Sequence, residues 1–180
     1  MLQHHMKYGV LAILLGALLT VTIERNALWR DDGTIWADSL AKTRKARGYN
    51  ELGLHLLAIG NSEGAYRTFA HSLALNAYQP TVYINLGIAL ERLNRIPEAI
   101  SAYERAIRFQ PDDPAPYYNA GILYYNVLHD RQKALSYLLK AKDIDPREPD
   151  VHQYLGRIYQ EAGNMEAART EIELYRYLNQ

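Results

Sequence analysis

The chain contains no cysteine among its 180 residues. This absence excludes disulfide bonds, thiolate metal sites and a thiol nucleophile. It also excludes the acylated cysteine of a bacterial lipoprotein. Any attachment to a membrane must therefore come from the polypeptide itself.

Neither sign of charge is in excess, because 20 Lys and Arg balance 20 Asp and Glu. A balanced chain lacks the long-range field that attracts nucleic acid, so we expect no nucleic-acid partner. Phenylalanine is scarce, with 2 residues, whereas tyrosine is abundant, with 15. Tyrosine suits half-buried positions, where the ring packs and the hydroxyl meets water or a partner.

Catalytic motifs are also missing. The sequence has no phosphate-binding glycine loop, no HExxH and no Gly-x-Ser-x-Gly. His4 and His5 are adjacent ligands on a short tail, which is a weak signal for a metal. We therefore predict a protein that is not an enzyme, with no catalytic residue, no metal and no cofactor.

Residues 8–23, YGVLAILLGALLTVTI, form an apolar run without a charge. As a helix this run covers about 24 Å, slightly less than the ~30 Å hydrocarbon layer, and Lys7 and Arg25 can extend from its ends to the interface. A buried soluble helix is disfavoured because the run is apolar all round. A cleaved signal peptide is disfavoured because no clear Ala-x-Ala site follows. The sequence thus predicts a single-pass anchor, residues 1–23 with their short head, in contact with membrane lipid.

Residues 24–45 link this anchor to the rest of the chain and contain its only tryptophans, Trp29 and Trp36. Indole rings commonly lie in the headgroup layer. Alternatively, Trp36 covers the open end of the domain that follows. The count of Lys and Arg after the anchor favours a cytoplasmic C-terminal part, whereas the short basic head favours the reverse, so the residues alone leave the orientation open.

From residue 46 onward the sequence repeats itself. The segment 80–113, PTVYINLGIALERLNRIPEAISAYERAIRFQPDD, is 34 residues long, and matching glycines and alanines recur at spacings of 34 or 35. The glycines are Gly53, Gly87, Gly121 and Gly156, and the alanines are Ala65, Ala99, Ala134 and Ala168. This period is typical of stacked helical hairpins. One extra residue falls in the third unit, within the turn NVLHDRQ.

Each unit is expected to contain two helices. We number the positions of a unit from Ala46, Pro80, Pro114 and Pro149. A glycine at position 8 costs a helix about 1 kcal/mol, so we expect it to allow close approach of the second helix. The large residue at position 24 is expected to pack against the next unit. His152 replaces an aromatic residue at position 4 of the last unit and is expected to be a packed core ring.

This pattern resembles the tetratricopeptide repeat (TPR) family over residues 46–180. The resemblance implies an all-α fold: a TPR α-solenoid of four helix-turn-helix repeats, preceded here by one N-terminal transmembrane helix. The expected repeats are 46–79, 80–113, 114–148 and 149–180. In the linker, the pattern Arg25-Asn26-x-x-Trp29, followed by Ile35-Trp36-x-Asp38 and a basic run, resembles the segment after the last membrane helix of certain TPR membrane proteins. That resemblance implies an inner-membrane protein with periplasmic repeats.

Two binding surfaces follow from the expected solenoid, whose first helices line a concave face. Asn85 and Asn119 share position 6, where an amide pairs with the backbone of an extended peptide or, equally, with the neighbouring helix. Tyr118 and Tyr125 lie seven residues apart and are expected to cradle an apolar side chain. The predicted groove residues are Asn85, Ile88, Arg92, Tyr118, Asn119, Ile122, Tyr125 and Arg157. Leu174 and Tyr177 form a second candidate, a docking surface at the end of the last helix.

We predict two alternative functions from these features. The first is a membrane-anchored scaffold or accessory subunit of a bacterial membrane complex, with protein partners among the other subunits. The second is an adaptor that binds extended peptides in envelope assembly or secretion. The two differ in the surface that they use, because a subunit is held by the anchor and the docking surface, whereas an adaptor depends on Asn85 and Asn119.

Overall fold

The chain divides into two compact units, Met1–Arg44 and Lys45–Gln180, in a computed structural model of the protein. Residues 41–180 are those that the structure describes. The predicted anchor, with Lys7, Arg25, Trp29 and Trp36, lies outside the described residues. Within residues 41–180, no helix has the length and apolar character needed to cross a membrane.

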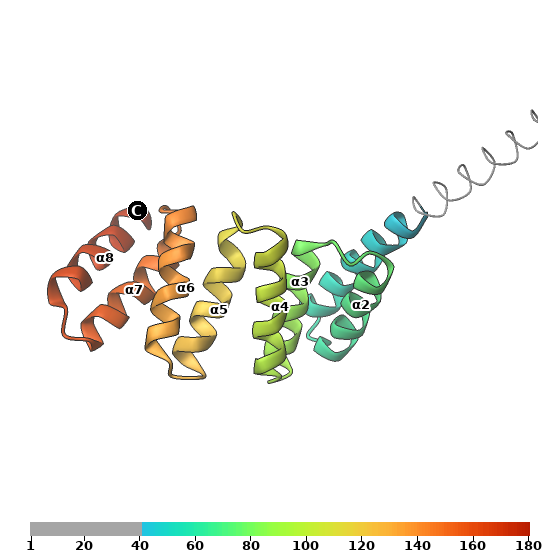
Figure 1. Cartoon of the computed structure of the whole chain (residues 1–180), viewed down its shortest axis with the longest axis horizontal. Coiled ribbons are helices and arrows are strands. Elements are labelled where there is room, and N and C mark those ends of the chain that lie inside the picture. Colours follow the sequence, from blue (N-terminus) through green and yellow to red (C-terminus); the bar gives the residue numbers. More distant parts are fainter. Residues whose placement is uncertain (1–40) are drawn as a thin grey trace, which may run out of the picture. The chain divides into compact units, whose positions relative to one another are not determined.

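The second unit is entirely helical. A helix over residues 41–58 forms the start of the described chain and supplies the first helix of this unit, and seven further helices follow, so the described part of the unit holds eight helices and no strand. In Figure 1 the helices follow one another in chain order, and each packs chiefly against its neighbours in sequence. They are α2 (Ser62–Leu75), α3 (Pro80–Arg92), α4 (Ile96–Phe109), α5 (Pro114–Asn126), α6 (Arg131–Ile144), α7 (Pro149–Glu161) and α8 (Met165–Leu178).

Proline and short polar side chains set the helix starts. Three of the helices, α3, α5 and α7, begin at a proline, whose fixed φ suits the first helical position and whose missing N–H needs no partner there. Others begin after a side chain that caps the free backbone N–H groups. Asp130, for example, accepts a hydrogen bond of 3.0 Å from the backbone N–H of Lys133 at the start of α6.

The turn between the two helices of each repeat contains one residue with a left-handed backbone conformation (positive φ). The hydrogen bonds of these turns show where the extra residue of the third repeat lies. Three of these turns are closed by an N–H that donates to a carbonyl five residues earlier, as from Arg95 to Leu90. In the third repeat the donor is Asp130 and the acceptor Tyr124, six residues earlier. His129 takes the left-handed φ of 54° in this turn. The extra residue therefore lies in the predicted turn and leaves the flanking helices in register.

A glycine and a large residue, which recur at the same spacing in every repeat, form the contact between the two helices of each repeat. A Cβ added at Gly87 would overlap the ring of Tyr103, and one at Gly53 would overlap the ring of Phe69. The same applies to Gly121 with Leu138, and to Gly156 with Ile172. The predicted role of the glycine is confirmed. The side chain at position 24 also occupies the space above the glycine of its own repeat, a contact that the sequence analysis did not assign to it.

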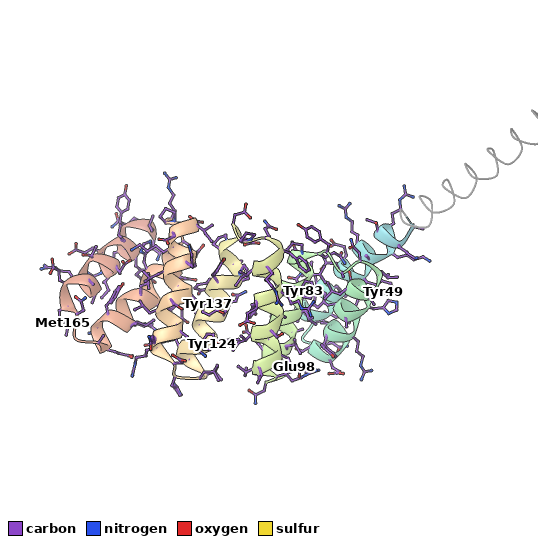
Figure 2. All side chains as sticks on the ribbon, in the orientation of Figure 1. Tyr49, Tyr83, Glu98, Tyr124, Tyr137 and Met165 are labelled. Atoms are coloured by element: carbon purple, nitrogen blue, oxygen red, sulfur yellow. The ribbon has the colours of Figure 1, made fainter. Side chains whose placement is uncertain are left out.

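Aromatic rings add to the core that runs through the repeats. Figure 2 shows Tyr124 of α5 beside Tyr137 of α6. The two rings stack with their centroids 5.5 Å apart and an interplanar angle of 21°. Lys133 lies with Nζ 5.0 Å from the centroid of the Tyr124 ring, on which it makes a cation–π contact. One cluster of buried side chains thus runs through the second, third and fourth repeats, and a second cluster joins the first repeat to α3.

Candidate partner-binding surfaces

The two asparagines at position 6 have different environments. Asn85 in α3 is buried, and its Nδ2 donates a hydrogen bond of 3.1 Å to Oδ1 of Asn50 in the preceding first helix. Asn119 in α5 is half-buried, and its amide has no hydrogen-bond partner among the described residues. Asn85 therefore connects neighbouring helices, whereas the Asn119 amide is available to a ligand.

The other predicted groove residues of α3 and α5 also divide between structure and surface. Arg92 donates from Nη1 to the carbonyl of Leu57, at 2.6 Å, and so caps the last turn of the helix over residues 41–58. Ile88 and Ile122 occupy position 9 in successive repeats and are half-buried. The two isoleucines lie on the same face as Asn119 and add apolar surface to it.

Tyr118 and Tyr125 do not face an empty space between them, because Tyr154 of α7 packs against both. Its ring centroid lies 6.1 Å from that of Tyr118 and 5.8 Å from that of Tyr125, edge-on in each case. Arg157, which is exposed, lies with Cζ 5.7 Å from the Tyr154 centroid. We call Tyr118, Tyr125 and Tyr154 the tyrosine cluster. The sequence places Tyr154 at position 6 with the two asparagines, on the expected concave face, but its contact with Tyr118 and Tyr125 was not predicted.

Charged groups surround this cluster and change its acid–base behaviour. Burial raises the pKa of Tyr118, and the nearby Asp150 carboxylate raises it further. Tyr125 donates from its hydroxyl to Oε1 of Glu161, at 2.6 Å, and this hydrogen bond raises the pKa of Tyr125. Arg131 donates to the other oxygen of Glu161, also at 2.6 Å. The hydrogen bond from Tyr125, followed by that from Arg131, lowers the pKa of Glu161.

The predicted docking surface lies on the last helix, α8. Tyr177 is 73% exposed and Leu174 is 37% exposed. In the second and third repeats the same two positions carry charged residues, which are Arg105 and Arg108 in α4, and Lys140 and Asp143 in α6. All four of these charged residues are exposed. The last helix thus presents an apolar pair where the second and third repeats present charge to solvent.

His152 is buried as predicted, but its contacts are polar. The ring is 1% exposed, with Nδ1 2.6 Å from Oε2 of Glu171 in α8 and Nε2 2.9 Å from the carbonyl oxygen of Pro146. Lys142 of α6 lies 2.6 Å from the other oxygen of Glu171. The sequence signals this cluster only by the histidine at position 4, where the other repeats have an aromatic residue. The partners Glu171 and Lys142 come from two other helices, so the sequence does not indicate them. In residues 41–180, no group of three or more possible ligands is placed to hold a metal ion.

Comparison with known proteins supports the TPR family. The model of a family described as TPR repeat matches residues 92–127. Protein O-mannosyl-transferase TMTC3 of Mus musculus is 31% identical over 96 residues, which are 53% of this chain but only 10% of the transferase.

Two solved structures share the fold. The crystal structure of MamA superposes with a TM-score of 0.70 at 22% identity and covers 75% of this chain and 78% of its own. The first TPR of Spaghetti (RPAP3), bound to an HSP90 peptide SRMEEVD, has a TM-score of 0.64 at 19% identity, over 67% of this chain and 95% of that one. The described residues of our chain therefore form an all-α, TPR-like helical solenoid.

Proposed function

We propose that the protein is a membrane-anchored scaffold, an accessory subunit that holds partners within a bacterial membrane complex. The predicted anchor over residues 8–23 confines it to the inner membrane, with the repeats on the periplasmic side. Confinement to a membrane raises the effective concentration of a partner in the same membrane, so weak contacts suffice for assembly. We propose no enzymatic role, and the resemblance to the mannosyl-transferase covers too little of that protein to suggest one.

This proposal rests on the exposure of two apolar side chains, Leu174 and Tyr177, on α8. Exposed apolar side chains that replace charges at equivalent positions of a repeat indicate a surface that is covered in use. A tyrosine is also among the residues that contribute most to protein interfaces, because its ring is large and rigid and its hydroxyl can form a hydrogen bond. We therefore place the contact with a permanent partner on α8.

Photo-crosslinking of the full-length protein in native membranes tests this placement. A crosslinking residue at position 177 is expected to capture a defined protein. The same residue at Asp143, the exposed equivalent of Tyr177 on α6, is expected to capture none. The paired substitutions Leu174→Lys and Tyr177→Asp copy the third repeat and are expected to release the partner while the helical content stays unchanged. If the captured complex survives both substitutions, α8 is not the docking surface.

A second candidate function, an adaptor for extended peptides, is favoured by Asn119. Its unpaired amide lies on the first-helix face with Ile122, and an amide can pair with both the N–H and the carbonyl of a peptide backbone. The Spaghetti domain of similar fold is bound to a peptide, which shows that such a solenoid can serve this purpose. If the protein is a peptide adaptor, Asn119→Ala is expected to abolish its binding of the peptide. If it is a scaffold subunit held through α8, the same substitution is expected to leave its complex intact.

A further inference from the structure

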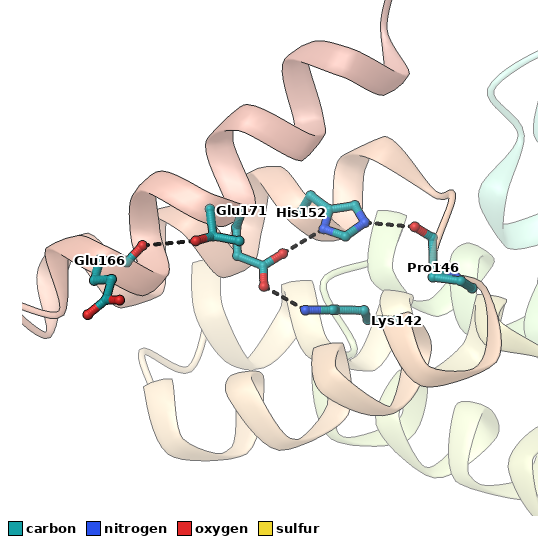
Figure 3. Close-up of polar contacts among 6 residues, drawn as sticks. Lys142, Pro146, His152, Glu166 and Glu171 are labelled. Atoms are coloured by element: carbon teal, nitrogen blue, oxygen red, sulfur yellow. Dashed lines mark hydrogen bonds and ion pairs between the residues drawn. The ribbon is translucent and has the colours of Figure 1, made fainter.

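The fourth repeat is attached to the third through a buried polar cluster that the other repeats lack. Figure 3 shows His152 of α7 between Glu171 of α8 and the carbonyl of Pro146, with Lys142 of α6 at the other carboxylate oxygen of Glu171. His152 is 1% exposed and Glu171 is 5% exposed. Three helices and the connection between α6 and α7 therefore meet at one carboxylate and one imidazole ring.

The two polar contacts of the His152 ring require an extra proton on the pair of His152 and Glu171. A neutral imidazole carries one N–H and can satisfy only one acceptor. Here both ring nitrogens face oxygen atoms, at 2.6 Å and 2.9 Å. Both contacts are hydrogen bonds if His152 carries two protons, or if Glu171 is protonated and donates to Nδ1 while Nε2–H donates to Pro146. The two arrangements hold the same number of protons, one more than a neutral ring beside a carboxylate.

Without this proton, one contact places two lone pairs against each other in a site that water does not reach. A buried polar group that loses its partner costs about 1–3 kcal/mol. In the described part of the chain, the charged side chain that contacts the pair of His152 and Glu171 is Lys142 from α6. Asp150 of α7 lies beside Tyr118 instead. Lys142 favours the carboxylate form of Glu171, so the proton belongs on His152.

The corresponding positions of the second repeat contain no such group. Tyr83 occupies the position of His152, and Ala102 occupies that of Glu171. We propose that His152 and Glu171 form a proton-dependent latch, which holds α7 and α8 on α6 when the extra proton is present and loosens α8 when the proton is lost as the pH rises. Histidine is the side chain whose unperturbed charge change lies nearest neutral pH, so the experiment below spans that range.

The latch has a consequence for binding that rests on the proposed function. Leu174 and Tyr177 lie on α8, one and two turns after Glu171. Loosening α8 would change the presentation of this apolar pair to a partner. A rise in pH is therefore expected to weaken docking on α8, whereas the loss of the latch itself is measurable without any partner.

Hydrogen exchange of the full-length chain in mild detergent, measured by mass spectrometry from pH 6 to pH 9 and corrected for intrinsic rates, tests the latch. We expect the protection of residues 165–178 to fall by about tenfold as the pH rises, because the opening of one repeat reports the loss of its own contacts. The protection of α3 and α4 is expected to stay constant and serves as the internal reference. Equal protection of α8 at all pH values would overturn the proposal.

Two variants complete the experiment. His152→Tyr combined with Glu171→Ala copies the pair of the second repeat and is expected to give a protection of α8 that does not depend on pH. His129→Gln changes an exposed histidine of the neighbouring turn and is expected to leave the response as it is. If His129→Gln removes the pH response, the proposal is wrong.

NMR of the wild-type ring provides a test that does not require the variants to fold. The ¹⁵N signals of His152 are expected to show both nitrogens protonated at pH 6, and one deprotonated at the pH where α8 loses protection. A ring that keeps one unprotonated nitrogen at pH 6 contradicts the latch. Because none of these measurements uses a partner, a failure of the latch leaves the docking surface to be judged by its own crosslinks.

Discussion

The ring of Tyr103 lies directly on Gly87, in the space that a Cβ of residue 87 would occupy. Tyr103 is fully buried, and its hydroxyl donates a short hydrogen bond to Glu91 one turn further along α3. The ring is therefore held at both ends and has no room to move aside. The glycine and the tyrosine of one repeat thus form a single packed contact between its two helices.

Gly87→Ala is accordingly expected to destabilise the protein by about 1–3 kcal/mol, the usual cost of overfilling a packed core. The matched control is Gly48→Ala, because a Cβ at Gly48 meets nothing within 4 Å. That substitution is expected to be neutral or to stabilise its helix by up to about 1 kcal/mol. Urea unfolding followed by circular dichroism measures both. Equal stabilities of the two variants would show that the core accommodates the methyl group.

Asn85 and Asn119 are expected to respond oppositely in assays of stability and of binding. Asn85→Ala removes the hydrogen bond to Asn50 from a buried site and is expected to cost about 1 kcal/mol of unfolding free energy. Asn119→Ala removes no hydrogen bond and is expected to change stability by less than about 0.5 kcal/mol.

A double-mutant cycle with Asn50→Ala isolates the pair. The interaction is expected to disappear when either asparagine is already replaced, so that the two single effects do not add. Additive effects would mean that the 3.1 Å contact contributes nothing in solution. The loss of stability in the Asn119→Ala variant would likewise show that its amide has a structural role.

The sequence predicted the arrangement of the repeats because that arrangement depends on short-range patterns. The spacing of Gly87 and Tyr103 within one repeat was sufficient to predict paired helices and their close contact. The polar cluster of His152 was not predictable in this way, since its partners Glu171 and Lys142 come from different helices and neither breaks the pattern of its own helix. The same holds for Tyr154, whose contacts with the tyrosines of α5 depend on the rotation between repeats.

Glu161 is expected to stabilise the contact between the third and fourth repeats, and this stabilisation is expected to be lost at low pH. Its pKa is lowered by the hydrogen bond from Tyr125 and then by that from Arg131. A carboxyl group with a lowered pKa in the folded state contributes stability above its ordinary pKa, near 4.3, and this contribution is lost as the pH falls below that value. Glu161→Gln is therefore expected to be less stable than the wild type at pH 7 and equal to it at pH 3.

Thermal unfolding at the two pH values measures this difference. Arg131→Gln serves as a second probe, because it removes one of the two donors to Glu161 and is expected to reduce the difference without abolishing it. The wild type and Glu161→Gln would show the same pH profile if the exposed carboxylate were screened by solvent.

Glu91 is expected to show the opposite dependence on pH. Burial raises its pKa, and the hydrogen bond from Tyr103 and the charge of Arg92 offset this effect only in part. A carboxyl group with a raised pKa makes its full contribution to stability below the ordinary value, near 4.3, and the contribution falls as the pH rises through the higher value of the folded state. The stability of the wild type relative to Glu91→Gln is therefore expected to be greatest at low pH and to decrease toward pH 7.

Glu91→Gln keeps the shape of the side chain and an oxygen that accepts from Tyr103, but it cannot ionise, so it isolates the cost of the buried charge. Unfolding free energies of the two proteins between pH 3 and pH 7 give the sign directly. The Glu161 pair of measurements is the control, because acid denaturation of the whole protein would move both comparisons in the same direction. A difference that grows with pH for Glu91 would mean that Tyr103 and Arg92 stabilise the carboxylate by more than its burial costs.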